Sequence, residues 1–319
     1  MILDKIQNSI YDTYNTIPGP IRQGIGEMFW HLNHGVQYLL AGAKEESIQI
    51  QGMKISYIEL GDRHNPTLVI LHGFSDAKES FLSFSSLLKD NFHIIIPDMP
   101  GFGNSSKPDR EYSLEFYSNV LNEFLKQIGV EKFHGLGNSM GGAILLEYNS
   151  LFKEKLLSIV LSCSAGLVPE YEGNHFYSEY KNGKNLFEIE EELEFEKFIS
   201  RLFYKKSTIP LPVRHYLFNK YKKNGRWYAK LMSEILGKYI GKEEDHHREV
   251  QLKKISDIEF PVLILWGKFD GVIPEDVAYL FKDSIPHAKM IIMDNTGHLP
   301  HLENPKDMFS IVRDFYLQL

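Results

Sequence analysis

A serine flanked by glycines lies between a strand-like segment and a helix-like one. Ser139 is part of the run Gly137-Asn138-Ser139-Met140-Gly141-Gly142, which follows apolar residues 132–136 and precedes a helical pattern beginning at Ala143. The outer glycines, Gly137 and Gly141, have no Cβ, so a tight turn can lift the serine hydroxyl above a sheet without clashes. This context predicts a nucleophile elbow with Ser139 as the nucleophile.

Two later positions can supply the groups that a nucleophilic serine needs. A serine hydroxyl is a weak nucleophile at neutral pH, so it requires a base to take its proton and an acid to orient that base. Asp270 follows the apolar run at residues 261–266, and His298 follows Gly297 after the run at residues 289–293. The order serine, aspartate, histidine is typical of chains with a nucleophile elbow. We predict Ser139 as nucleophile, His298 as base and Asp270 as orienting acid.

An upstream turn can supply the electrostatic part of the chemistry. The apolar run at residues 67–71 ends in His72-Gly73-Phe74, a strand leading into a turn of small residues. An acyl carbonyl under attack develops negative charge on its oxygen, and losing one fixed N–H donor to that oxygen costs roughly 2.7–4 kcal/mol. We predict that the backbone N–H groups of Phe74 and Met140 form this oxyanion hole.

Other histidines and acids compete for these roles. For the base, the alternatives are His72, His287 and His301; for the acid, they are Asp276 and Asp294. The strand-like run at residues 157–161 leads into Ser162-Cys163-Ser164, which offers no carboxylate. Asp98 precedes a glycine turn that we interpret as structural. His298 and Asp270 are favoured because each directly follows a buried strand and its turn.

Strand-like apolar runs alternate with helical patterns along most of the chain. They lie at residues 54–60, 67–71, 92–96, 132–136, 157–161, 261–266 and 289–293. Such alternation predicts an α/β fold with a mainly parallel central sheet flanked by helices.

The alternation stops between Gly166 and about Gln251. Helical candidates there lie at residues 186–203, 213–221 and 227–239, among many aromatic residues that either line an acyl pocket or pack this segment onto the core. We interpret residues 166–250 as an inserted helical cap. The core is then residues 47–165 and 251–319, and residues 1–46 form an N-terminal helical arm.

The motifs together resemble a known family, the α/β-hydrolases of the serine esterase and lipase type. The elbow, His72-Gly73-Phe74, the turn from Asp98 to Ser105, Trp266-Gly267-Lys268-Phe269-Asp270 and Gly297-His298 through Glu303-Asn304-Pro305 match that family in order, from about Ser47 to the end of the chain. The stretch from His72 to Lys78 with Phe81 is similar to monoacylglycerol lipases and related bacterial lipases. The resemblance implies a cap over the site between two core strands.

Composition limits the partners. The net charge of −7 over 319 residues argues against a nucleic-acid partner, which would require a basic face. No phosphate-binding glycine motif is present, so no nucleotide cofactor is implied. The lone Cys163 is interpreted as buried and inert, and His246-His247 beside three acids as a solvated charge run rather than a metal site. We expect neither a cofactor nor a metal.

The N-terminal arm carries apolar residues at helical spacing. One stretch includes Ile2, Ile6, Ile10 and Tyr14, and a second runs from Ile25 to Leu40. Neither is a continuous apolar run of about 20 residues, so neither should span a bilayer, and the first does not resemble a cleaved signal peptide. The arm either packs on the core or lies in a membrane interface. We expect a cytoplasmic location, with peripheral membrane contact through this arm as the second interpretation.

These features favour a serine hydrolase that acts on carboxylic esters of medium to long acyl chains, such as monoacylglycerols, through an acyl-enzyme. Its partner would be a small-molecule or lipid ester. Two alternatives remain. A carbon–carbon bond hydrolase of ring-cleavage products shares the elbow motif, although this chain has Phe74-Ser75-Asp76 and Leu299 where that group typically has a glycine-rich turn and a tryptophan. A ligand-binding receptor built on the hydrolase fold is the other.

Overall fold

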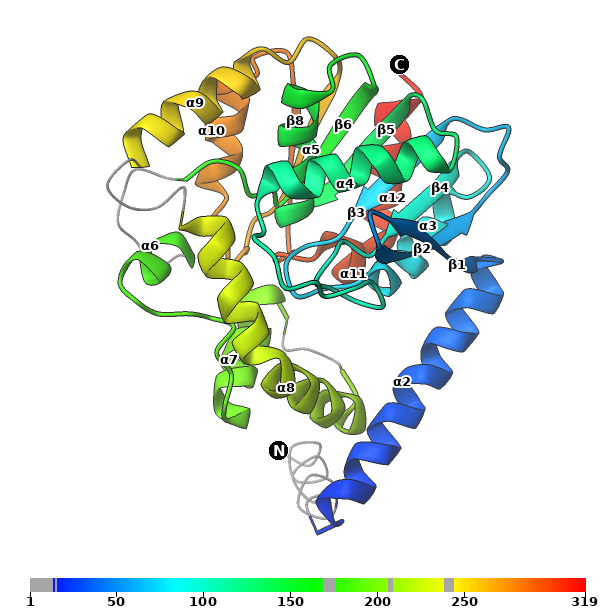
Figure 1. The fold of residues 1–319 in the computed structure, drawn as a ribbon, viewed down its shortest axis with the longest axis vertical. Helices are drawn as coiled ribbons and strands as arrows, with labels where there is room; N and C mark the ends of the chain where they lie inside the picture. The colour runs from blue at the N-terminus through cyan, green and yellow to red at the C-terminus, as the bar shows by residue number, and fades with distance from the viewer. Residues whose placement is uncertain (1–13, 15, 169–175, 206–208, 238–243) are drawn as a thin grey trace.

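The computed structural model describes residues 14, 16–168, 176–205, 209–237 and 244–319. Within these ranges the chain forms an eight-stranded sheet (Figure 1). Its strands, in the order β1-β2-β4-β3-β5-β6-β7-β8 across the sheet, are β1 (Lys44–Ile50), β2 (Met53–Leu60), β3 (Thr67–Leu71), β4 (His93–Pro97), β5 (Phe133–Asn138), β6 (Leu156–Ser162), β7 (Val262–Gly267) and β8 (Lys289–Met293). β2 pairs antiparallel with both β1 and β4, and the other neighbours are parallel. The expected α/β fold with a mainly parallel sheet is confirmed.

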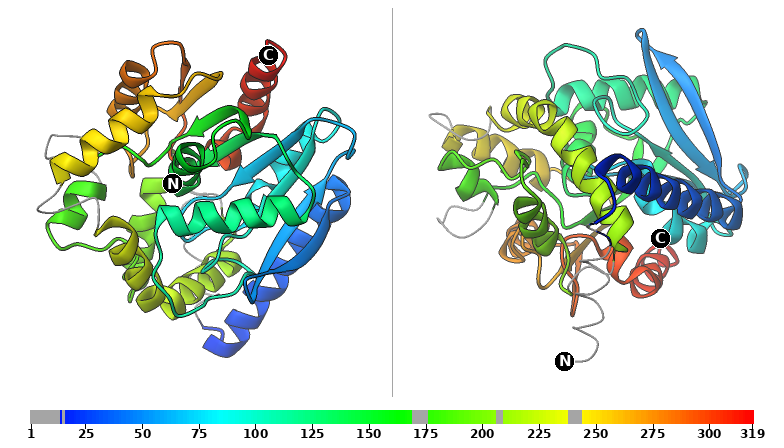
Figure 2. Two further views of the ribbon diagram at one scale, coloured as in Figure 1. Left: turned by 45° about the horizontal axis from the view of Figure 1, so that its top comes forward. Right: turned by 90° about the horizontal axis from the view of Figure 1, so that it is seen from below.

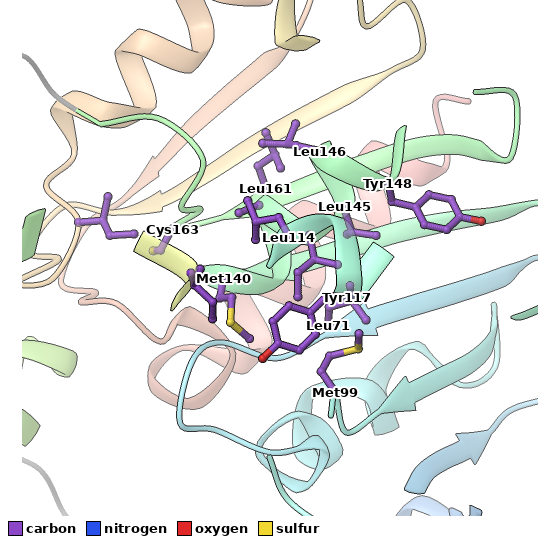
Figure 3. Close-up of a cluster of buried hydrophobic side chains, with 14 of the residues drawn as sticks. Leu71, Met99, Leu114, Tyr117, Met140, Leu145, Leu146, Tyr148, Leu161 and Cys163 are labelled. Carbon is purple, nitrogen blue, oxygen red and sulfur yellow. The ribbon is translucent and has the colours of Figure 1, made fainter. Parts of the chain in front are cut away.

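Each face of the sheet carries a hydrophobic core. Because side chains alternate along a strand, Val69 and Leu71 of β3 enter one core and Leu68 and Ile70 enter the other. The first core packs under α4 (Leu114–Gln127), α5 (Met140–Leu151), α9 (Glu244–Ser256) and α10 (Asp276–Ser284). The second packs under α3 (Leu82–Leu88) and α12 (Pro305–Tyr316). Figure 3 shows part of the first core, where Leu71 lies beside side chains from α4 and α5.

Helices replace strands between β6 and β7. They are α6 (Phe176–Lys181), α7 (Glu192–Leu202), α8 (Leu211–Leu236) and α9. In Figure 1, α6, α7 and α8 form a group of their own at the lower left of the sheet. This is the position expected for an inserted cap, although α9 continues from residue 244 into the core layer. Residues 169–175, 206–208 and 238–243 of the expected cap lie outside the described residues.

The structure has one long helix where the sequence predicted two separate cap helices. α8 spans most of the segments expected as separate helices at residues 213–221 and 227–239, because Gly225 does not break it. An added Cβ at Gly225 would lie 3.5 Å from the Phe187 carbonyl oxygen, an ordinary contact distance, so the packing here does not require glycine. The helix expected at residues 186–203 begins only at Glu192, where Glu191 and Glu194 form a capping box.

Most of the described part of the N-terminal arm is one long helix. α2 (Gly19–Ala41) packs against α8, and an added Cβ at Gly26 would lie 2.2 Å from the Pro212 carbonyl oxygen. Figure 2 shows α2 running beside one end of α8. β1 begins at Lys44, three residues before the expected start of the core. Residues 1–13 and 15 of the arm lie outside the described residues. No helix in the described ranges is long and apolar enough to cross a bilayer.

Candidate active site

Ser139 sits at the sharp turn between β5 and α5. Its φ of 53° and ψ of −120° lie in a region that residues with a side chain rarely adopt. The flanking glycines leave room for this turn: an added Cβ would lie 2.4 Å from backbone atoms of Gly141 if placed on Gly137, and 2.2 Å from the Leu71 carbonyl oxygen if placed on Gly141. The structure therefore has the strand, turn and helix expected of an elbow, with the helix starting at Met140 rather than Ala143.

His298 and Asp270 form a buried pair. Nδ1 of His298 lies 2.7 Å from Oδ2 of Asp270, and 4% of the histidine is exposed. The other carboxylate oxygen, Oδ1, accepts hydrogen bonds from the backbone N–H groups of Val272 at 2.8 Å and Ile273 at 2.9 Å. A carboxylate held in this way accepts a hydrogen bond from Nδ1–H and so keeps the proton on Nδ1, which leaves Nε2 unprotonated and able to act as a base.

Ser139 and His298 meet in one pocket. Both line a cavity that also borders Phe74, Met140 and the cap. Asn138 ties the elbow to the loop of His298, because its side-chain amide donates to the His298 carbonyl oxygen and also to that of Ser162 at the end of β6, each at 3.1 Å. This role of Asn138 was not predicted from the sequence. The available signal was an amide side chain directly before the elbow serine.

The two N–H groups expected in the oxyanion hole border the same cavity. Met140 is the first residue of α5, where a backbone N–H has no acceptor within the helix. Next to Phe74, the second expected donor, Nδ1 of His72 lies 2.7 Å from the Gly73 carbonyl oxygen. Nε2 of the same histidine accepts the Met99 N–H at 3.0 Å. Since the C=O and N–H of a trans peptide point in opposite directions, this contact turns the Phe74 N–H away from His72. His72 thus orients backbone groups and is not placed as a base.

The other rival residues lie away from the pocket lining. His301 is fully buried and stacks on Phe81 with ring centroids 3.9 Å apart; burial, and next the nearby His298, lower its pKa to about 3. Asp98 forms a buried ion pair with Lys78 at 2.8 Å. The remaining candidates occupy other places: His287 contacts the Phe260 carbonyl, Asp276 begins α10, and Asp294 pairs with Lys268 on the surface.

Cys163 lies beside Asp270 and His298. Its Sγ and the ligand atoms of Asp270 and His298 all lie within 4.8 Å of one another. The Gly267 N–H donates to this sulfur at 3.4 Å, and burial, followed by the charge of Asp270, raises the pKa of the thiol well above its usual value. A protonated, buried thiol is a poor nucleophile, so it acts here as a small packing residue.

The pocket lining is mainly apolar and comes largely from the cap. Five aromatic residues of the cap border it, namely Phe176, Tyr177, Phe187, Phe198 and Tyr221. Tyr171, another aromatic residue of the cap sequence, lies outside the described residues. His247 and Arg248 of α9 also line it, so the interpretation of His246-His247 as a solvated charge run is wrong for His247, whereas His246 is exposed. Glu243, one of the neighbouring acids, lies outside the described residues. The cavity can hold an apolar chain next to Ser139.

Comparisons with known proteins agree with this geometry. The family model described as the alpha/beta hydrolase fold matches residues 66–305. Lipase 1 of Psychrobacter immobilis is 32% identical over 79% of this chain and 77% of its own length. Monoacylglycerol lipase ABHD6 of Homo sapiens is 25% identical over 83% of this chain and 82% of its own length.

Solved structures show the same fold. A membrane phospholipase A superposes with a TM-score of 0.85 at 26% identity, covering 100% of this chain and 99% of that one. The 2-hydroxy-6-oxo-6-phenylhexa-2,4-dienoate hydrolase of Rhodococcus sp. strain RHA1 gives a TM-score of 0.70 at 19% identity over 86% of this chain and 99% of its own, a likeness of fold alone. The chain belongs to the α/β-hydrolase fold family and is a carboxylic ester hydrolase of the esterase and lipase type.

Proposed function

We propose that this enzyme hydrolyses carboxylic esters of medium to long acyl chains, such as monoacylglycerols, with Ser139, His298 and Asp270 as its catalytic triad. The observation that carries the triad is the 2.7 Å contact between His298 and Asp270 beside the elbow serine. The apolar pocket and the names of the relatives, lipases and monoacylglycerol lipases, support an acyl-chain substrate.

The reaction follows from the orientation of His298. Its unprotonated Nε2 takes the proton of the Ser139 hydroxyl as the serine oxygen bonds to the ester carbonyl carbon. The Phe74 and Met140 N–H groups stabilise the negative oxygen that develops. The carbon–oxygen bond to the alcohol then breaks, and His298 returns the proton to the leaving alcohol. Water, deprotonated by the same nitrogen, releases the acid from Ser139, so the residues present complete the cycle.

The test is a substrate panel measured with the unchanged chain and Ser139→Ala. It runs from short p-nitrophenyl esters to long monoacylglycerols and includes one ring-cleavage dienoate. We expect turnover that rises with acyl length and is lost in the variant. Activity on short esters alone would retain the triad and reject the lipid substrate. Cleavage of the dienoate alone would support the carbon–carbon hydrolase, and a Ser139 that reacts with a fluorophosphonate without turning over any ester would support a receptor.

Helix α2 is proposed to lie against a lipid surface. A stripe of its apolar residues is exposed: Ile21, Met28, Phe29, Leu32, Val36, Leu39 and Leu40. The most exposed, Leu39, has 81% of its surface free. An enzyme whose ester substrates reside in lipid gains from such a stripe, because each leucine buried in the interface contributes roughly 1.5–3 kcal/mol.

Sedimentation with phosphatidylcholine vesicles tests this contact. The double substitution Leu32→Ser and Leu39→Ser should weaken binding at least about tenfold. Leu317→Ser is the matched control, since Leu317 is 72% exposed but lies at the end of the chain, away from α2. Equal binding of both variants would contradict the proposal. Concentration-dependent dimers that the double substitution abolishes, without vesicle binding, would assign the stripe to a second copy of the chain.

A further inference from the structure

The end of cap helix α7 contacts the loops that carry the catalytic acid and base. The contacts come from residues 201–204, here called the 201–204 segment. The Arg201 carbonyl accepts the Gly271 N–H at 3.1 Å, directly after Asp270, and the Leu202 carbonyl accepts the His298 N–H at 2.8 Å. Both carbonyls belong to the last turn of the helix, where no N–H group of the same helix donates to them. The cap thus supports both loops through its main chain.

Glu303 adds a second link between the cap and the histidine loop. This residue ends the short helix α11 (Pro300–Glu303). Its Oε1 accepts the Gly297 N–H at 2.7 Å, and its Oε2 accepts the Tyr204 N–H at 2.8 Å. One carboxylate therefore joins the residue before His298 to the 201–204 segment. Burial raises the pKa of Glu303, so the site disfavours the charged form, while the two N–H donors act in the opposite direction.

The close approach leaves no room for side chains on two loop glycines. An added Cβ at Gly271 would lie 2.8 Å from the Arg201 carbonyl oxygen, and one at Gly297 would lie 2.7 Å from the Leu202 carbonyl oxygen. Distances below 3.0 Å require the backbone to move. Glycine at both positions is thus required by the cap, and a shift of the cap changes the position of both loops.

The geometry points to the 201–204 segment and Glu303 as positioning elements of the triad. Through these contacts, catalytic activity depends on the position of the cap. This inference rests on the proposed triad. Asp270 and His298 lie on separate loops, and each loop is held by a hydrogen bond to this one cap segment. Displacement of the segment by even 1 Å would lengthen the acid–base contact or misdirect Nε2, and misplacement of that size is enough to lower the rate about a hundredfold. The cap therefore affects kcat as well as substrate binding.

Two substitutions test the link without touching a triad side chain. Glu303→Gln keeps the shape but replaces one accepting oxygen by an NH₂ group that faces a backbone N–H. Gly271→Ala pushes a methyl group against the Arg201 carbonyl. For each we expect kcat on a short p-nitrophenyl ester to fall about tenfold to a hundredfold with KM changed less than about threefold. The rate of Ser139 labelling by a fluorophosphonate should fall by the same factor, since labelling needs the positioned base.

Matched controls separate this effect from general destabilisation. Gly24→Ala adds a methyl group where nothing lies within 4 Å, and Glu131→Gln removes an exposed charge. Both should retain kcat and the labelling rate. If Glu303→Gln and Gly271→Ala lower only the unfolding midpoint, while the folded fraction labels at the normal rate, the inference is wrong. Should Glu303→Gln fail to fold, Gly271→Ala alone decides. Turnover that survives Ser139→Ala would instead reject the triad itself.

Discussion

Replacing Asp270 by asparagine should reverse the tautomer of His298. In the native protein, Oδ1 of Asp270 accepts two backbone N–H groups and Oδ2 faces Nδ1 of the histidine. An asparagine must keep its single oxygen at the position of Oδ1, because an NH₂ group there would face two donors. Its NH₂ group then occupies the position of Oδ2 and donates to Nδ1. The imidazole proton must move to Nε2, which can no longer accept the proton of Ser139.

The expected loss follows from removing both the base and its counter-charge. We expect kcat on p-nitrophenyl esters at neutral pH to fall about 10⁴-fold, which corresponds to about 5.4 kcal/mol of transition-state stabilisation. The free energy of unfolding should change far less, because the asparagine retains the hydrogen bonds from Val272 and Ile273. Steady-state kinetics and urea unfolding of the same sample measure the two quantities.

Asp294→Asn is the matched control, since Asp294 pairs with Lys268 at 3.0 Å on the surface and its side chain is 75% exposed. It should retain full activity. A kcat of Asp270→Asn within tenfold of the unchanged chain would show that another acid orients His298. A loss of activity accompanied by an equal loss of folded protein would show that Asp270 stabilises the fold rather than the tautomer.

Three further outcomes follow from buried groups. Burial lowers the pKa of His301 to about 3, so below about pH 6.5 the unfolded chain binds a proton that the native state does not. Stability should therefore fall between pH 6.5 and 3, and His301→Phe should recover up to about 3 kcal/mol of that loss in urea unfolding at pH 4. Lys78→Met leaves the fully buried carboxylate of Asp98 without its cation, so calorimetry should show a loss of about 3–5 kcal/mol. Gly141→Ala would place a methyl group 2.2 Å from the Leu71 carbonyl oxygen, and we expect Ser139 labelling by a fluorophosphonate to become undetectable or the protein to be destabilised by about 1–3 kcal/mol.

The sequence predicted the elements that are buried on both sides. β3 and β7 are almost continuous apolar runs, and β5 and β6 are mainly apolar with a few polar residues, because parallel strands covered on both faces bury almost every side chain. β1 was not predicted, since it is an edge strand whose first four residues are exposed and polar. α9 was not predicted either, because its sequence has little apolar periodicity. Where burial is partial, the pattern on which such predictions depend is weak.

The candidate site was predictable where chemistry fixes the residue type. A nucleophile, a base and an acid must be particular side chains in a particular chain order, so Ser139, His298 and Asp270 could be predicted from the sequence as candidates. The support from the 201–204 segment could not, because the accepting groups at Arg201 and Leu202 are carbonyls that any residue provides. Glu303 was noted only as part of a motif, and its role required knowing where the cap ends.

Main-chain contacts between cap and catalytic loops have a consequence for how this enzyme can diverge. We expect that most of the pocket-lining side chains of α7 and α8 can be exchanged while the Arg201 and Leu202 carbonyls continue to accept the same N–H groups. Mutations in the cap can thus alter which ester fits without dismantling the reaction centre. Chimeras that graft a foreign cap should remain active when the junction preserves the backbone path of residues 201–204, and should lose activity when the path changes length there. In laboratory evolution, the 201–204 segment should then be kept unchanged, and the remainder of the cap can be randomised.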